Sequence, residues 1–278
     1  MTRMTSLSNE RLQGYSTTSV QPYWNAVAIL AVTKETLCFT SAGDTLLRTG
    51  EEIALLAFVM GEEDGNPGEI ERASSVIFEI WNSDGKVLEI TAQITQTSPG
   101  YAIAEALTEP LPPDLYTVKV RLGGNPYYQA GETSSELAVY DPEGGHVYGA
   151  GLLSGDGLRL FSFQVRYTRR NPQVPTGNLH FMDLGVRRNP VRITATSFTY
   201  LVIPVEKDKA YVTGSCTFNG QRGYSFFLEI EDRDRRSLKS MDWLRIIVRN
   251  SAGDIVYQAE GLVRAGLIEV YRRRERDH

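Results

Sequence analysis

Apolar and polar residues alternate along most of the chain, and this pattern predicts β-strands. Segment 161–168 places aromatic residues and a valine on one face of an extended chain and polar residues on the other, and segments 115–122 and 76–81 alternate in the same way. Segment 53–60 is apolar on both faces, as is typical of a strand that is covered on both sides. Because no long stretch has helical spacing, we expect an all-β protein.

Turn-forming residues separate these segments. The pattern Asn-Ser-x-Gly occurs twice, at 82–85 and at 250–253, each time between alternating apolar residues. Gly85 and Gly253 can adopt the positive φ angles that tight hairpins need. Both segments therefore predict short β-hairpins, and Asn219 with Gly220 predicts a third tight turn.

One break in the pattern divides the chain into two parts. Segment 140–151 contains Pro142 and four glycines, which interrupt regular structure. We therefore predict two antiparallel β-sandwich domains in series. The predicted organisation is a polar N-terminal arm at 1–24, a first β-sandwich at 25–141, a Gly/Pro linker at 142–151, a second β-sandwich at 152–271 and a charged tail at 272–278.

The 278-residue chain distributes its charge unevenly. Residues 1–145 contain 8 basic and 20 acidic residues, a net charge of −12, whereas the remainder contains 21 basic and 14 acidic residues, a net charge of +7. Such an asymmetry favours attraction between the domains or between neighbouring molecules. We therefore expect protein partners or self-association.

Cysteine and histidine are too sparse to predict a cofactor or a metal centre. Cys38 and Cys216 lie far apart in the sequence, and His146, His180 and His278 are isolated from one another. They form neither a disulfide framework nor a zinc-binding spacing. We predict two buried thiols, no cofactor and no histidine-based metal site.

No segment is apolar over the ~20 residues that a membrane-spanning helix needs. The apolar run at 26–32 is short and lies too far from Met1 to act as a signal peptide. We therefore expect no membrane span.

An acidic segment ends the run from Thr213 to Asp234. Alternation of apolar residues at 224–230 places Glu229 and Glu231 on the outward face of a strand, followed by Asp232. A solvated strand edge, neutralised by neighbouring arginines, is the first interpretation. The alternative is an ion site, since calcium accepts carboxylate oxygens, although the spacing of known calcium loops is absent.

No catalytic motif is present in the sequence. Nucleophile elbows, phosphate-binding loops and zinc motifs are missing. Paired carboxylates of a hydrolase could be hidden among the 34 acidic residues, and this remains the third functional hypothesis. The arginines of the basic half follow no known nucleic-acid-binding module, so we predict no nucleic-acid partner. We name no catalytic residue and do not expect an enzyme.

Three aromatic residues are candidates for ligand binding. Trp81 lies opposite the apolar face of its predicted strand, and Tyr127 and Tyr128 lie in a predicted loop. Exposed rings on a rigid β-domain can stack on sugars, which favours a carbohydrate-binding module as the second functional hypothesis. The alternative is that Trp81 is covered by the second sheet or by the neighbouring domain.

The second half of the chain also resembles a known family. A strand with Leu201 and Val202 precedes a Lys-Ala-x-x-x-Gly-x-x-x-x-Asn-Gly segment at 209–220, which an aromatic strand, an acidic loop and an Arg-Ile hairpin follow. This order resembles the post-COAP type of β-domain. The first half looks like an immunoglobulin- or macroglobulin-type domain. The resemblance covers about 25–260; Tyr200 stands where the family often has Trp.

This resemblance implies a location and a role. Such tandem domains typically form the C-terminal end of large secreted and surface proteins of bacteria and archaea, so the resemblance implies an extracellular or cell-surface protein. The large N-terminal partner and the export signal of such proteins are missing from this sequence. Either Met1 is not the natural start, or the chain is a fragment, or the domains serve in a smaller assembly such as a virion or filament. It implies a non-enzymatic structural or adhesive role and carries over no catalytic residue. A structural or adhesive module of a surface or of a virion or filament is therefore the leading functional hypothesis.

Overall fold

A computed structural model gives the fold of most of the chain. It describes residues 26–32, 37–41, 45–60, 75–98, 101–122, 131–155, 157–185, 190–205, 208–233 and 241–272. Strands dominate these ranges, which contain no helix, so the all-β prediction is confirmed. In the described part of the chain, the structure therefore has no helix that could span a membrane.

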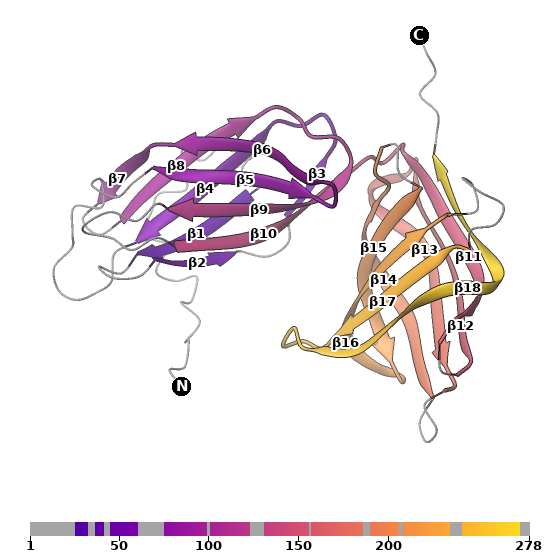
Figure 1. Cartoon of the computed structure of the whole chain (residues 1–278). Helices are drawn as coiled ribbons and strands as arrows, with labels where there is room; N and C mark the ends of the chain where they lie inside the picture. Colours follow the sequence, from indigo (N-terminus) through magenta and orange to yellow (C-terminus); the bar gives the residue numbers. More distant parts are fainter. Residues whose placement is uncertain are drawn as a thin grey trace, which may run out of the picture.

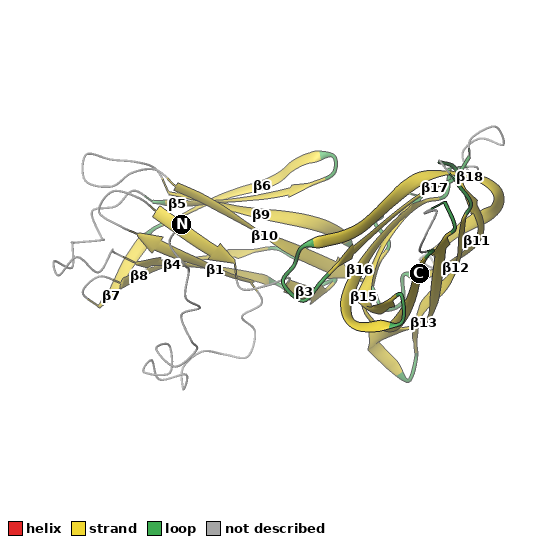
Figure 2. Ribbon diagram, turned by 90° about the horizontal axis from the view of Figure 1, so that it is seen from below, coloured by secondary structure: helices red, strands yellow, loops and turns green. Residues whose placement is uncertain are grey.

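The first unit consists of two five-stranded sheets (Figures 1 and 2). The first sheet has the order β2 (Leu37–Ser41), β1 (Ala26–Val32), β4 (Ile53–Met60), β8 (Tyr101–Thr108) and β7 (Ile94–Ser98). The second has the order β3 (Thr45–Arg48), β10 (Gly131–Tyr140), β9 (Asp114–Leu122), β5 (Val76–Asn82) and β6 (Gly85–Ala92).

One apolar core lies between these two sheets. It contains Leu55 and Val59 from β4 together with Phe78 from β5 and Tyr116 from β9, all of them buried. We predicted purely antiparallel sheets, and this was wrong. Strand β1 pairs parallel with β4, and β3 pairs parallel with β10. Alternation predicts that a segment is a strand, but it does not define the direction of its partner.

The second unit is a closed barrel of eight strands. Each strand pairs antiparallel with the next along the chain, and the last pairs with the first. The strands are β11 (Gly145–Leu153), β12 (Arg159–Thr168), β13 (Asn171–Asp183), β14 (Val191–Val202), β15 (Lys209–Phe218), β16 (Gln221–Glu231), β17 (Trp243–Arg249) and β18 (Ile255–Arg272).

The predicted second β-sandwich is therefore a barrel, and strand β18 explains the difference. Its first part, from Ile255 to Leu262, pairs with β17, and its second part, from Val263 to Arg272, pairs with β11. A single long strand thus joins both ends of the sheet, which leaves no open sheet edge at this seam. Alternation along each strand is the same in a barrel and in a sandwich.

A glycine allows β18 to approach β11 where the barrel closes. Gly266 has a φ of +111°, and a Cβ atom added there would lie 2.0 Å from the carbonyl oxygen of Ala150. We expect Gly266→Ala to lower the free energy of unfolding by at least about 2 kcal/mol, since both strain and overlap oppose the methyl group. Urea titration of the full chain measures the change.

The matched control is Gly253→Ala. Gly253 also has a positive φ, +87°, but no atom lies within 4 Å of the added Cβ. Only backbone strain acts there, so the expected loss is about 1 kcal/mol. Equal losses at the two positions would show that close approach at Gly266 does not constrain the barrel.

The predicted tight turns are confirmed. Asn82 Oδ1 accepts a hydrogen bond from the backbone N–H of Asp84 (2.9 Å), and Asn250 Oδ1 accepts one from the N–H of Ala252 (3.0 Å). Both turns end on a glycine with positive φ. The third turn uses Asn219, with a φ of +50°. An asparagine side chain stabilises such turns by bonding to the backbone that follows it.

A tyrosine pair joins the two units. Tyr140, the last residue of β10, stacks on Tyr167 of β12 with 5.2 Å between ring centroids, and both rings are buried. The Tyr167 hydroxyl donates to the carbonyl oxygen of Leu201 (3.2 Å) and accepts from the N–H of the same residue (3.1 Å). Burial raises the pKa of Tyr167 above its usual value. The hydroxyl therefore stays protonated and can donate.

The first unit also contributes apolar residues to the core of the barrel. Ala138 of β10 belongs to that core, and Leu46 and Leu115 pack against it. Strand β10 is thus shared between two hydrophobic cores: Leu137 and Val139 face the core of the first unit, and Ala138 and Tyr140 face the barrel.

The predicted linker at 142–151 is shorter than expected. The greater part of this segment, from Gly145 onward, belongs to strand β11. Gly145, Gly149 and Gly151 lie where an added Cβ would overlap β18 or Phe163, so they serve close strand packing and not flexibility. The predicted arm at 1–24 lies outside the described residues, as does all of the predicted tail except Arg272, which ends β18.

Candidate functional site

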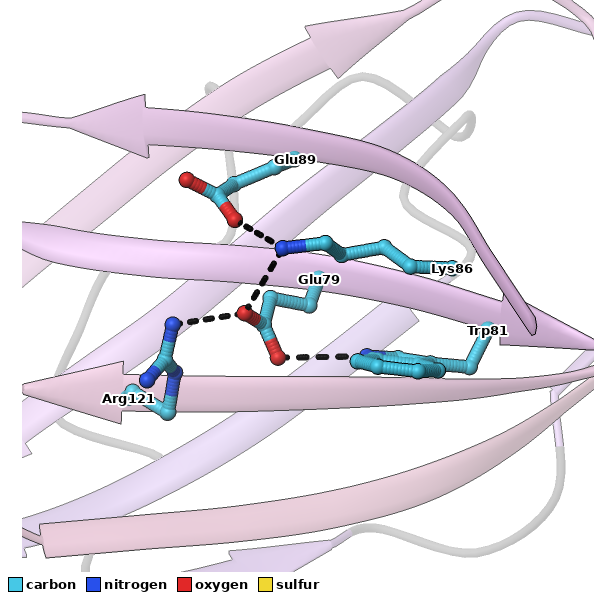
Figure 3. A network of polar contacts seen from close by, with 5 residues as sticks. All are labelled: Glu79, Trp81, Lys86, Glu89 and Arg121. Carbon is cyan, nitrogen blue, oxygen red and sulfur yellow. Dashed lines mark hydrogen bonds and ion pairs between the residues drawn. The ribbon is translucent and has the colours of Figure 1, made fainter.

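A network of polar contacts covers the outer face of the second sheet of the first unit (Figure 3). Glu79 of β5 is its centre: its carboxylate accepts from Arg121 Nη2 (2.6 Å), Lys86 Nζ (3.4 Å) and Trp81 Nε1 (3.1 Å). Lys86 also contacts Glu89 at 2.5 Å. The side chain of Glu79 is only 7% exposed although it points away from the core.

Strand register explains how these residues meet. In the sheet, Glu79 lies opposite Glu89 of β6 on one side and Lys119 of β9 on the other, and Trp81 lies opposite Lys86. Side chains that lie opposite or diagonally across neighbouring strands are within contact distance. Alternation predicted the outward face of each strand, but the pairing of β5 with β9 is long-range and has no local signal.

The network favours a charged carboxylate at Glu79. Burial raises the pKa of Glu79, but the hydrogen bond from Trp81 and the positive charges of Arg121 and Lys86 outweigh burial and lower it. The hydrogen bond and charge of Glu89 raise the pKa of Lys86. A carboxylate that is held in its ionised form by three donors is a structural anchor, and it is a poor proton acceptor.

Trp81 lies within this network. Its indole ring is half-buried on the outer face, so neither the other sheet of the first unit nor the barrel covers it completely. Lys119 Nζ lies 4.8 Å and Lys86 Nζ 5.8 Å from the ring centroid, which is the range of cation–π contacts. The ring is therefore engaged by lysines of its own sheet. Tyr127 and Tyr128, the other predicted ligand-binding residues, lie outside the described residues.

The acidic segment of the second unit belongs to β16, which lies between β15 and β17 in the closed barrel. Glu229 and Glu231 point outward as predicted, but each side chain is only 14% exposed. Glu229 pairs with Arg245 at 2.8 Å, and Glu231 pairs with both Lys209 and Arg233 at 2.5 Å. The interpretation as a solvated strand edge is therefore wrong, because the strand has a partner on both sides. The predicted neutralisation by a neighbouring arginine is confirmed for Arg233.

Asp232 points to the opposite side of the chain. It is 3% exposed, and its Oδ2 accepts a hydrogen bond from the backbone N–H of Val270 (3.1 Å). The three candidate ion ligands, Glu229, Glu231 and Asp232, therefore do not converge. Among the described residues, no group of three His, Cys, Asp or Glu side chains is placed to hold a metal ion.

Asp232 and Asp242 act at the seam of the barrel. Where β18 leaves β17, Asp242 accepts from the N–H of Arg233 through Oδ1 (2.9 Å) and from the N–H of Ile268 through Oδ2 (2.8 Å). Strand β18 has no β17 partner beyond Leu262, so these carboxylates take the place of a neighbouring strand. In the sequence, Asp232 was a candidate ion ligand, whereas no pattern pointed to Asp242.

A third buried carboxylate lies where β12, β13 and β18 meet. Asp183, 2% exposed, accepts hydrogen bonds from Tyr257 (2.7 Å), Arg159 Nε (3.0 Å) and the N–H of Gly185 (2.8 Å). Burial opposes the charge of Asp183, but these donors lower its pKa. Its donors come from the neighbouring strand β12, from the distant strand β18 and from the segment that follows β13. No local sequence pattern could therefore predict the whole set.

Cys216 is buried in the barrel core. Burial raises the pKa of its thiol to about 11, so it is protonated at neutral pH. This agrees with the predicted core thiol, because nucleophilic cysteines have lowered pKa values.

The pKa values of the two glutamates of β16 shift in opposite directions, so we expect different effects on stability when each is replaced. Burial and the charges of Lys209 and Arg233 compete at Glu231, and the cations prevail, so its pKa is lowered. At Glu229, burial, reinforced by Glu231 and Glu260, outweighs Arg245, so its pKa is raised. We expect Glu231→Gln to cost about 1–2 kcal/mol of unfolding free energy at pH 7 and Glu229→Gln to change it by less than about 0.5 kcal/mol.

The directions of these two pKa shifts determine how the stability of the fold depends on pH. The stabilisation by Glu231 is fully present above the pKa of an unfolded glutamate, about 4.3, and is lost as pH falls through the lower folded pKa. Glu229 has the opposite sign: its raised pKa stabilises the fold at low pH, and this contribution is lost as pH rises. Denaturation of both variants from pH 3 to 8 measures the difference. A larger loss for Glu229→Gln at pH 7 would contradict this assignment.

Comparison with known proteins gives no close relative. No known protein family matches the sequence, and no curated protein matches it. Two solved structures, the uncharacterized protein lmo2446 and the cycloalternan-forming enzyme in complex with a pentasaccharide, both from Listeria monocytogenes, match 76% of this chain at 13% identity with a TM-score of 0.27. This chain spans 18% of the length of each. At this TM-score the likeness supports no conclusion about function.

Proposed function

We propose that this chain is a non-enzymatic structural or adhesive module, used at a cell surface or in an assembly such as a virion or filament. The observation that carries the proposal is the shared strand β10. Its residues alternate between the core of the first unit and the core of the barrel, and Tyr140 stacks on Tyr167 at the junction. Such a junction holds the two units in one fixed orientation.

The buried carboxylates support the same proposal. Asp183, Asp232 and Asp242 each accept hydrogen bonds that join distant segments, and Glu79 joins three strands. These carboxylates therefore serve to hold the fold together. A rigid body with its charged groups used as cross-links suits a protein that positions other proteins.

A carbohydrate-binding module is the second candidate, supported by the half-buried, outward-facing ring of Trp81. The lysines that contact this ring favour the structural role over sugar binding. A sugar would have to displace Lys119 from the indole face, at the cost of the cation–π contact.

A panel of glycans and chromogenic glycosides tests the proposal on the full chain. We expect no turnover of any glycoside and no glycan binding that depends on Trp81. The Trp81→Phe variant keeps an aromatic ring and serves as the control for Trp81→Ala. Glycan binding that Trp81→Ala abolishes and Trp81→Phe retains would favour the carbohydrate-binding module. Glycoside hydrolysis by the pure protein would contradict a non-enzymatic role.

A further inference from the structure

An open groove lies on the outer wall of the barrel, over strands β12 to β15. Two rows of side chains cross neighbouring strands there: Leu160, Met182 and Arg192 in one row, and Ser162, His180, Thr194 and Thr217 in the other. They line two adjoining hollows of about 220 and about 600 Å³ that share Arg192 and Thr194. The second hollow extends to the turn at Asn219.

The groove contains one positive charge, that of Arg192. Its lining contains no aspartate or glutamate. Arg192 is exposed, and none of the residues that the structure describes forms an ion pair with it. Asp183, the nearest acidic residue along β13, is bonded to Arg159 and Tyr257. An anionic ligand therefore matches the groove.

The backbone of Arg192 is held in place. Its N–H donates to Asn219 Oδ1, and its carbonyl oxygen accepts from the N–H of Asn219, both at 2.8 Å. Asn219 adopts the positive φ of the turn between β15 and β16. Two hydrogen bonds thus join β14 to this turn beneath the groove. The backbone that carries the guanidinium is therefore already ordered, and binding has to order only the exposed side chain.

The remaining lining favours a sugar over a peptide or a nucleic acid. The strands beneath the groove are paired with one another, so no free backbone edge is available to an added peptide strand. The aromatic residues of the lining, Phe161 and Phe181, are buried and offer no ring on which a base could stack. Hydroxyl groups and exposed aliphatic carbons alternate instead, and these match the hydroxyls and C–H faces of a pyranose.

We propose that this groove binds an acidic oligosaccharide through a uronic-acid carboxylate held by Arg192. The planar guanidinium can donate two parallel hydrogen bonds to a carboxylate. His180, Thr194 and Thr217 contact sugar hydroxyls, and Leu160 and Met182 pack against the ring. The surplus of basic residues in this half of the chain attracts such a polyanion. This inference rests on the adhesive form of the proposed function and names its ligand class.

Isothermal titration of the full chain with hexagalacturonate tests the proposal, with neutral maltohexaose as the comparison. We expect binding of the acidic sugar only, and Arg192→Gln should weaken it at least about tenfold, the effect of losing one charged hydrogen-bonding partner. Arg249→Gln is the matched control, because Arg249 is an exposed barrel arginine whose side chain, among the described residues, donates a hydrogen bond only to the carbonyl oxygen of Gly253 in its own turn. It should change the affinity less than about twofold.

Three results would overturn the proposal. They are the absence of hexagalacturonate binding, equal weakening by Arg192→Gln and Arg249→Gln, and equally tight binding of single-stranded oligothymidylate, which would indicate general attraction to polyanions. Circular dichroism of each variant verifies that it is folded. Failure here leaves the rigid structural module intact, because the junction at Tyr140 is tested separately by a distance measurement.

Discussion

Replacement of Asp242 by Ala is expected to lower the free energy of unfolding of the barrel by about 3–5 kcal/mol, since it removes a buried charged acceptor from two donors. Asp242 is 4% exposed and accepts from the N–H groups of Arg233 and Ile268. Without the carboxylate, the buried N–H of Ile268 and the partly buried N–H of Arg233 lose their acceptor. The expected result is a barrel that opens between β17 and β18.

Two controls accompany this variant. Asp242→Asn keeps one oxygen acceptor and should cost less than Asp242→Ala. Asp254→Ala removes an exposed carboxylate from the turn before β18 and should cost less than about 1 kcal/mol. Fluorescence of Trp243 reports on the barrel when Trp24 and Trp81 are replaced by Phe. A loss for Asp242→Ala no larger than that for Asp254→Ala would contradict the role of Asp242 at the seam.

Replacement of Phe226 by Ala is the second change with a large expected effect, a loss of about 3–5 kcal/mol. Phe226 of β16 is 1% exposed, and its ring meets Phe198 edge to face with 5.9 Å between centroids. Truncation leaves a cavity between β14 and β16 that strands fixed in a closed barrel cannot collapse to fill. Urea unfolding followed by Trp243 fluorescence measures the loss.

The neighbouring residue supplies the control. Phe227 points to the outer face, is half-buried and stacks on Tyr211 at 6.1 Å. Phe227→Ala should cost about 1–2 kcal/mol, because part of that ring is already in water. If the two truncations cost the same, the assignment of inner and outer faces on β16 is wrong.

Strand β16 illustrates what the sequence can predict. Alternation correctly assigned Phe226, Leu228 and Ile230 to the buried face and Glu229 and Glu231 to the other. It did not predict that both glutamates are nearly covered, because their partners Lys209 and Arg245 come from neighbouring strands whose register is set by the whole barrel. A local pattern defines faces, whereas pairing defines contacts.

The alternation of apolar and polar residues could not predict closure of the barrel, because closure also depends on strand pairing. It depends on β18 changing partners after Leu262 and on Asp232 and Asp242 bonding to the freed N–H groups. Both aspartates lie in charged segments that resemble surface loops. Trp81 was singled out for its outward position, but the lysine that covers its ring comes from β9, which is distant along the chain.

The most direct test of the account measures whether the two units move as one body. Spin labels at positions 83 and 251, in the β5–β6 and β17–β18 turns, report the distance between the units by pulsed electron paramagnetic resonance. Cys38 is replaced by Ser, and buried Cys216 stays unlabelled. We expect one narrow distance distribution, which broadens in Tyr140→Ala because the stack on Tyr167 is lost. A broad distribution in the unmodified junction would contradict a rigid structural module.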